Sequence, residues 1–167
     1  MVMKLPFFHP LLAANEVDMI SIQTQDFDIS TETQLLEHGN HADGALVTFT
    51  GRVRNKNLGD QVTALHLEHY PGMTEKSLAQ IIEQAQARWP INRVKVIHRI
   101  GTLAVGEQIV FVGVTSPHRK AAFAACEFIM DYLKVDAPFW KKELTADGAR
   151  WLDAKDSDKS KAQDWQN

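Results

Sequence analysis

The chain has 167 residues, of which 44% are hydrophobic, and a formal net charge of -3 at pH 7. This length is typical of one domain, and the apolar content is sufficient for a sizeable core. The slightly acidic balance argues against a nucleic-acid-binding module, which needs a wide basic face with interleaved aromatic residues. A single cysteine, Cys126, excludes an intramolecular disulfide and a zinc site made of several cysteines.

Both ends of the chain differ from its middle. Residues 1–18 are largely apolar but are interrupted by prolines and lack a convincing cleavage site, so we expect a poorly ordered leader rather than a secretory signal. Residues 154–167 are polar and charged and predict a mobile tail, although Trp165 could dock on the domain. We expect one domain over residues 19–153. Because no stretch reaches the ~20 apolar residues of a membrane span, we expect a cytoplasmic protein without membrane contact.

The first half of the domain predicts a strand, a helix and a hairpin. Residues 19–28 alternate apolar and polar side chains, and residues 31–37 follow with a helical pattern. Residues 44–53 and 62–70 predict two further strands. Because the sequence between them, RNKNLGD, is rich in turn formers, we expect these strands to pair in one hairpin with a long basic tip.

The second half adds more helices and strands without a regular alternation. The hydrophobic patterns predict a helix over residues 74–88, strands over 94–100, 108–115, 138–144 and 150–152, and a long helix from the cap Ser116 and Pro117 to about Leu133. Since strands and helices do not alternate cleanly, a doubly wound parallel sheet is disfavoured. We expect an α+β fold with a largely antiparallel sheet.

Cationic side chains stand at both ends of the long helix and at the end of the second strand. His118 and Arg119 lie at the helix N-terminus, where free N–H groups and the helix dipole attract an anion. Arg52 and Arg54 share one face of a strand. Two positive charges side by side repel each other, so this arrangement is unfavourable without a counter-anion. The plainer alternatives are solvated side chains at the helix and a neighbouring surface carboxylate at the strand.

Two lysines, Lys134 and Lys141, flank a turn that contains the apolar pair Phe139 and Trp140. An amine beside apolar walls loses solvation, which lowers its pKa and makes it usable as an acid, a base or a nucleophile. The alternative is a lysine interacting with the helix dipole and an exposed strand lysine. Asp136 lies between them and is expected to point to solvent.

Cys126 is the obvious candidate nucleophile, but its position favours the core. It shares a stripe of helical spacing with Phe123, Met130 and Leu133, which predicts the buried face of the helix. A buried thiol is a poor nucleophile, so any sulfur chemistry would use sulfur from another molecule. The seven histidines also lack metal-ligand spacing, and we expect no metal.

Five sequence motifs resemble those of a known family. They are TFTGRVRNKNLGD, LEHYPGMTEK, VIHRIG, VFVGVTSPHR and FIMDYLKVDAPFWKKE, in this order. Together they resemble the large, catalytic subunit of molybdopterin synthase over about residues 43–153. The resemblance implies an α/β hammerhead with an additional, largely antiparallel β-sheet subdomain.

The resemblance also implies a function and partners. It implies a cytoplasmic sulfurtransferase of molybdenum cofactor biosynthesis, with no cofactor of its own. The sulfur would come from the C-terminal Gly-Gly thiocarboxylate of a small ubiquitin-like sulfur-carrier subunit, and the substrate would be cyclic pyranopterin monophosphate. Two sulfurs would be placed on it to form the molybdopterin dithiolene. The implied assembly is a homodimer within a heterotetramer.

The site residues that the resemblance implies coincide with the cationic clusters. Lys134 and Lys141 are the implied catalytic residues. The implied substrate-binding residues are Arg52, Val53, Arg54, His118, Arg119, Lys134, Lys141, Lys142 and Glu143. Both the substrate phosphate and the thiocarboxylate are anions, so several fixed cations are needed to hold them together.

The length of the long helix constrains how these residues meet. His118 and Lys134 are sixteen positions apart, which is about 24 Å along a helix axis. If both contact one small substrate, they come from different copies of the chain, so we expect composite sites in a homodimer. A non-catalytic anion-sensing or scaffold protein would use the same clusters without a thiocarboxylated partner.

Overall fold

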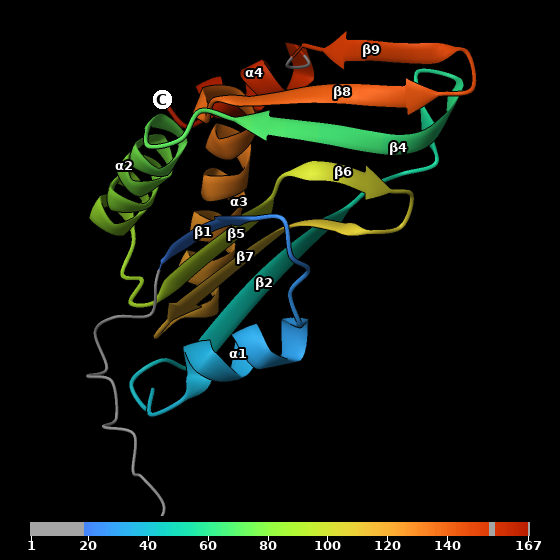
Figure 1. Cartoon of the computed structure of the whole chain (residues 1–167). Coiled ribbons are helices and arrows are strands. Elements are labelled where there is room, and N and C mark those ends of the chain that lie inside the picture. The colour runs from blue at the N-terminus through green and yellow to red at the C-terminus, as the bar shows by residue number, and fades with distance from the viewer. Residues whose placement is uncertain (1–18, 154–155, 167) are drawn as a thin grey trace, which may run out of the picture.

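A computed structural model describes residues 19–153 and 156–166, which form two sheets and four helices (Figure 1). The first sheet has the strand order β1 (Ile20–Gln23), β5 (Val94–Arg99), β7 (Gln108–Ser116) and β2 (Ala45–Arg52). Strands β1 and β5 are parallel, and the other two pairs are antiparallel. The described part of β2 therefore lies at one edge of this sheet.

The second sheet is antiparallel throughout its described strands. It contains β3 (Lys56–Asn57), β4 (Asp60–His69), β8 (Phe139–Thr145) and β9 (Gly148–Leu152), with β6 (Gly101–Ala104) paired to β4. Strand β4 pairs with β6 on one side and with β8 on the other. Mixed helices and a largely antiparallel sheet arrangement confirm the predicted α+β class.

Helices cover both faces of the first sheet. Helix α3 (Arg119–Asp136) packs on β7 and β2, with α2 (Met73–Arg88) beside it (Figure 1). Helix α1 (Ile29–Glu37) lies against the opposite face, where Leu36 packs with Phe111. The main core lies between α2, α3 and the sheet, because these helices bury their apolar stripes there.

The buried stripe of α3 contains Cys126, as predicted, but not Phe123. Cys126 is buried, and burial, with a smaller contribution from the charge of Glu127, raises the pKa of its thiol to about 12. Phe123 is 63% exposed. The buried face instead includes Ala122 and Ile129, which are fully buried. The expectation of a core thiol is therefore confirmed, while the expected boundary of the stripe was wrong.

The predicted hairpin of residues 44–53 and 62–70 was also wrong. Strand β2 pairs with β7, whereas β4 belongs to the other sheet. A period-two pattern identifies a strand but not its partner. The turn formers still make a turn: Leu58 (φ 51°) and Gly59 (φ 88°) both have positive φ, and they fold the two-residue strand β3 back onto β4.

The polar C-terminal segment was expected to be a mobile tail, but its described part is ordered against the core. Residues Asp156–Asp164 form α4, which packs on α3. The Trp165 ring lies 5.4 Å from the ring of Trp89, and its Nε1–H donates to Asp131 (2.9 Å). One tryptophan and the buried Ala162 thus anchor a helix that is otherwise charged. The predicted leader, residues 1–18, and positions 154, 155 and 167 lie outside the described residues.

Candidate functional site

A cationic hollow lies where the chain leaves β2. Its volume is about 550 Å³, and it is open to solvent. The residues that line it include three cations and no acid: Arg52, Val53, Arg54, Asn55, Lys56, Val105 and Gly106. Such a surface suits a phosphate, because guanidinium groups form forked, charge-assisted hydrogen bonds to phosphate oxygens.

Backbone contacts around Val53 hold the segment that carries the two arginines of this hollow. The β2–β7 register shifts between Gly51 and Arg52, and a bulge of this kind re-aims the side chains that follow it. The Val53 side chain is buried, its N–H donates to the Glu107 carbonyl (3.0 Å), and its own carbonyl accepts from Gly106 (2.8 Å). Arg52 and Arg54, on either side, are exposed, and Nε of Arg52 donates to the Gly106 carbonyl (2.9 Å).

His118 and Arg119 lie at the other end of the β2–β7 pair. Ser116 pairs with Ala45 at the start of β2, and the Ser116 hydroxyl accepts a hydrogen bond from the His118 N–H (3.1 Å). The helix begins at Arg119 with His118 as its cap residue, slightly later than predicted. Both side chains are exposed at the N-terminus of α3, where the helix dipole favours an anion.

Lys134 lies in the last turn of α3, so the helix separates it from Arg119. Fifteen residues of helix correspond to about 22 Å. The Lys134 side chain is 43% exposed, and its Nζ lies 3.9 Å from Asp158 of α4. Asp136 is exposed, as expected, although partial burial of its carboxyl raises the pKa above the usual value.

Lys141 lies on β8, two residues after Phe139, beside a buried histidine that the sequence analysis did not select. It is half-buried and pairs with Leu67 of β4. The Phe139 ring stacks on His98 with 3.8 Å between centroids and 18° between planes. His98 is 2% exposed, and burial, assisted by the charges of Lys141 and His69, lowers its pKa to about 3. The lysine therefore has a neutral imidazole in its surroundings.

The next two residues of β8 point to opposite faces, as strand geometry requires. Nζ of Lys142 lies 5.2 Å from the ring centroid of Trp151, which is cation–π geometry. Glu143 is 4% exposed, and its carboxylate accepts hydrogen bonds from Arg150 (3.1 and 3.0 Å) and from Asn57. Glu143 thus connects β8 to β9 and β3, and Arg150 is its main cationic partner.

The structure therefore groups the predicted residues by region. Arg52, Val53 and Arg54 share one hollow, and Lys134 and Lys141 lie on the two sides of the short connection from α3 to β8. His118 and Arg119 lie at the far end of α3. Sequence reasoning missed His98, Arg99 and Arg150. The sequence holds no clear signal for the first two: β5 carries three polar residues, Lys95, His98 and Arg99, and only the structure shows that all three are buried.

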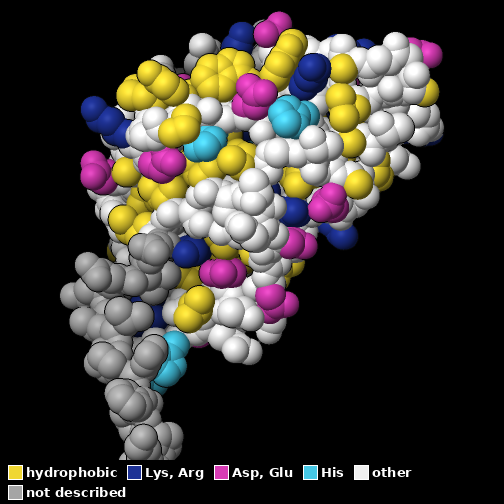
Figure 2. Space-filling model, viewed as in Figure 1, with side chains coloured by type: hydrophobic (Ala, Val, Ile, Leu, Met, Phe, Trp, Pro, Cys, Tyr) yellow, Lys and Arg dark blue, Asp and Glu magenta, His cyan; other side chains and the backbone are white. Residues whose placement is uncertain are grey.

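Other functional classes receive little support from the described residues. On the face shown in Figure 2, Lys and Arg side chains are interspersed with Asp and Glu and do not form one basic surface. Among residues 19–153 and 156–166, no three His, Cys, Asp or Glu side chains are grouped as metal ligands would be. None of the described helices has the length and apolar character needed to cross a membrane.

Comparison with known proteins places the chain in a family. A family model described as MoaE protein matches residues 22–136. The chain is 62% identical over 147 residues to the molybdopterin synthase catalytic subunit of Vibrio cholerae, covering 88% of this chain and 97% of the relative. It is 58% identical to the protein of the same name from Escherichia coli, covering 87% and 97%.

Solved structures agree with the sequence comparison. A molybdopterin biosynthesis MoaE protein from Burkholderia ambifaria superimposes with a TM-score of 0.76 at 49% identity, covering 89% of this chain and 98% of that one. A molybdopterin synthase from Staphylococcus aureus gives a TM-score of 0.75 at 35% identity, covering 83% and 99%. The expected hammerhead-type α+β fold is thereby confirmed. By sequence and by fold, the chain belongs to the MoaE family.

Proposed function

We propose that this chain is the catalytic subunit of a molybdopterin synthase and acts as a sulfurtransferase in the cytoplasm. It transfers two sulfurs from the C-terminal thiocarboxylate of a small ubiquitin-like partner to cyclic pyranopterin monophosphate, forming the molybdopterin dithiolene. The names of its relatives support this assignment. The structural observation that carries it is the acid-free hollow lined by Arg52, Arg54 and Lys56, which is suited to a phosphorylated substrate.

The chemistry requires cations but no sulfur nucleophile from this chain. The thiocarboxylate sulfur bonds to a side-chain carbon of the pterin and displaces the oxygen bound to that carbon, which leaves with a proton. Water then attacks the acyl carbon of the resulting thioester. The acyl C–S bond breaks, so the sulfur stays on the substrate and the partner leaves with a carboxylate. Lys134 and Lys141 align the thiocarboxylate, stabilise the oxyanion on the acyl carbon and relay protons. Cys126 is buried and has no part in these steps.

The separation of the cations supports a site shared by two copies of the chain. Seven residue steps along β2 separate Ala45, next to the His118 end, from Arg52, which is about 24 Å at 3.4 Å per residue. One small substrate cannot contact both ends of one copy. Pairing the β2 edges of two copies about a twofold axis would place the Ala45 end of one beside the Arg52 end of the other. The homodimer, inside a heterotetramer with two small subunits, then holds two composite sites.

A direct test is turnover with a thiocarboxylated small subunit and cyclic pyranopterin monophosphate, with dithiolene detected by mass spectrometry. Lys134→Ala and Lys141→Ala should each reduce product formation about a hundredfold or more while binding of the small subunit survives. Lys76→Ala, at an exposed position of α2, is the matched control and should retain wild-type turnover. Near-normal turnover in both site variants would remove these lysines from the mechanism.

Mixing two inactive variants tests the shared site. One chain carries His118→Ala and Arg119→Ala, and the other carries Lys134→Ala and Lys141→Ala. After subunit exchange, about half of the dimers are mixed and each regains one intact site, so about a quarter of wild-type activity should return. Absence of any rescue, with mixed dimers demonstrated by mass spectrometry, would contradict the shared site.

A further inference from the structure

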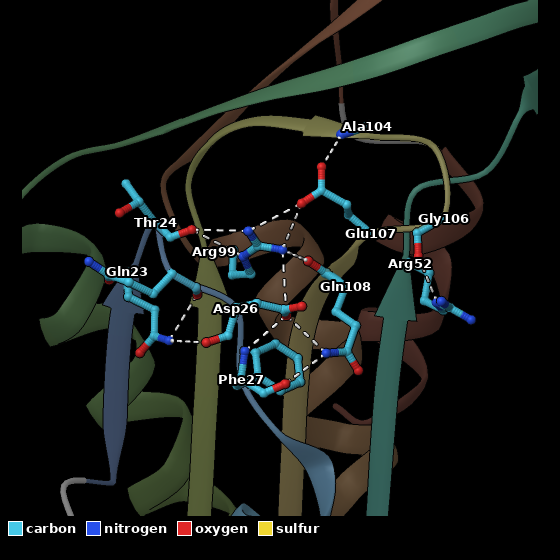
Figure 3. A network of polar contacts seen from close by, with 11 residues as sticks. Gln23, Thr24, Asp26, Phe27, Arg52, Arg99, Ala104, Gly106, Glu107 and Gln108 are labelled. Atoms are coloured by element: carbon cyan, nitrogen blue, oxygen red, sulfur yellow. Dashed lines mark hydrogen bonds and ion pairs between the residues drawn. The ribbon is translucent and has the colours of Figure 1, made fainter.

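Arg99 is a buried arginine with no role in the chemistry above. Its side chain is 7% exposed, and it lies at the end of β5 (Figure 3). The guanidinium donates to the Thr24 carbonyl (3.2 and 3.1 Å) and to the Gln108 carbonyl (3.0 Å). It also contacts one oxygen of the Glu107 carboxylate (3.4 Å from both terminal nitrogens). One side chain therefore joins the end of β1, the start of β7 and the turn before β7.

Glu107 links Arg99 to the cationic hollow by hydrogen bonds. Its second carboxylate oxygen accepts a hydrogen bond from the Ala104 N–H, and its backbone carbonyl accepts from Val53. The preceding Gly106 has φ +88°, a conformation that side chains other than glycine rarely adopt, and its carbonyl accepts from Arg52. Figure 3 shows these contacts in sequence from Arg99 through Glu107 to Gly106 and Arg52.

We propose that Arg99 and Glu107 are positioning residues that hold the Arg52–Arg54 segment in its anion-binding conformation. This inference rests on the proposed function, because it assigns the hollow to the phosphorylated substrate. The turn of residues 104–107 has little side-chain packing of its own, since Ala104, Val105 and Gly106 are exposed. Backbone hydrogen bonds hold this turn, and the Glu107 carboxylate adds the side-chain contact that links it to the buried Arg99. A preformed cation pair binds an anion more tightly, because fewer rotamers are lost on binding.

Electrostatics alone predicts the opposite effect, which makes the inference testable. Neutralising Glu107 removes a negative charge near the hollow and would by itself strengthen anion binding. Asp26 supplies the matched control: its carboxylate lies 3.5 Å from the same guanidinium and accepts a hydrogen bond from the Gln108 side chain (2.9 Å), and in Figure 3 it contacts no residue of the turn 104–107. Removing the charge of Asp26 therefore changes the potential without loosening residues 104–107.

The experiment compares Glu107→Gln, Arg99→Lys and Asp26→Asn in the full chain with its thiocarboxylated partner. We expect KM for cyclic pyranopterin monophosphate to rise about tenfold in the first two variants with kcat within about twofold of wild type. Asp26→Asn should keep KM within about twofold. Equal KM values in Glu107→Gln and Asp26→Asn would overturn the inference, and so would a fall in kcat without a change in KM.

A coupling measurement separates positioning from general stability. If Glu107 acts through the arginines, Glu107→Gln should raise KM much less in an Arg54→Ala background than in wild type. Additive effects would contradict the inference. Inactive wild-type protein would instead contradict the proposed function. In that case amide hydrogen exchange still tests whether Glu107 holds the segment, because exchange at Val53 and Gly106 should accelerate in Glu107→Gln and not in Asp26→Asn. Unchanged exchange in Glu107→Gln would overturn the inference.

Discussion

Acidification should destabilise this fold through His98. The ordinary pKa of a histidine is 6.5, whereas burial lowers that of His98 to about 3. Between these two values the unfolded chain binds a proton at this position and the folded chain does not. The free energy of unfolding therefore rises with pH through this window, and the stability that the neutral His98 contributes is lost as pH falls. At about 1.4 kcal/mol per pH unit, the loss between pH 6.5 and 5 is about 2 kcal/mol.

The measurement is urea unfolding at pH 6.5 and pH 5 at one fixed protein concentration, for wild type and His98→Asn. The asparagine amide can replace the ring N–H that lies 2.9 Å from the Arg99 carbonyl, but it does not titrate. We expect the variant to be less stable at pH 6.5, because it loses the stack on Phe139, and to lose about 2 kcal/mol less on acidification. His66→Asn, at a half-buried histidine on β4, controls for the loss of a histidine as such. Equal losses in wild type and His98→Asn would refute the reasoning.

Three further predictions concern the packing of the fold. Trp165→Ala should lower the free energy of unfolding by about 2 kcal/mol in urea titrations, because the contact that anchors α4 is lost; an unchanged midpoint would contradict this. Gly113→Ala should cost about 1–3 kcal/mol in the same assay, since the added methyl group would overlap the buried Leu36 side chain; a neutral result would show that Leu36 can move aside. Cys126, with its pKa raised to about 12, should resist alkylation at pH 8 until urea unfolds the chain, and rapid labelling of native protein would contradict its burial.

The periodic segments of the chain were predictable because their apolar residues repeat at the spacing of one local structure. The long helix shows this, since its stripe around Cys126 is long enough to define a face. Strand partners were not predictable in this way. Strand β2 pairs with β7, which is distant in the sequence, and the alternation of residues 44–53 contains no information about that partner. Docking of Trp165 was considered from the sequence, but the helix α4 was not predicted, because its segment is polar and lacks an apolar stripe.

The residues of the candidate site also differ in whether a local sequence pattern could identify them. Arg52 and Arg54 were found from the alternation of one strand, and His118 from the start of one helix. Arg99 and Arg150 were not found, because their importance lies in partners that are distant in sequence or on another strand. Arg99 is identified by its contact with Thr24, 75 positions away, and Arg150 by its ion pair with Asp60, 90 positions away. Such pairs appear only once the sheets are assembled.

The two sheets exchange chain at neighbouring points. Of the several crossovers in the described chain, one leads from β2 to β3 through Val53, and another leads from β6 to β7 through Gly106. The Gly106 N–H donates to the Val53 carbonyl and the Val53 N–H donates to the Glu107 carbonyl, and these two hydrogen bonds tie the crossovers together beside Arg52 and Arg54. The arginines of the proposed binding site thus lie at the junction of the two sheets, where a small rotation of one sheet against the other changes their spacing. If Arg52 and Arg54 hold the substrate as we propose, distant core substitutions that alter this inter-sheet angle should change substrate affinity without altering either arginine.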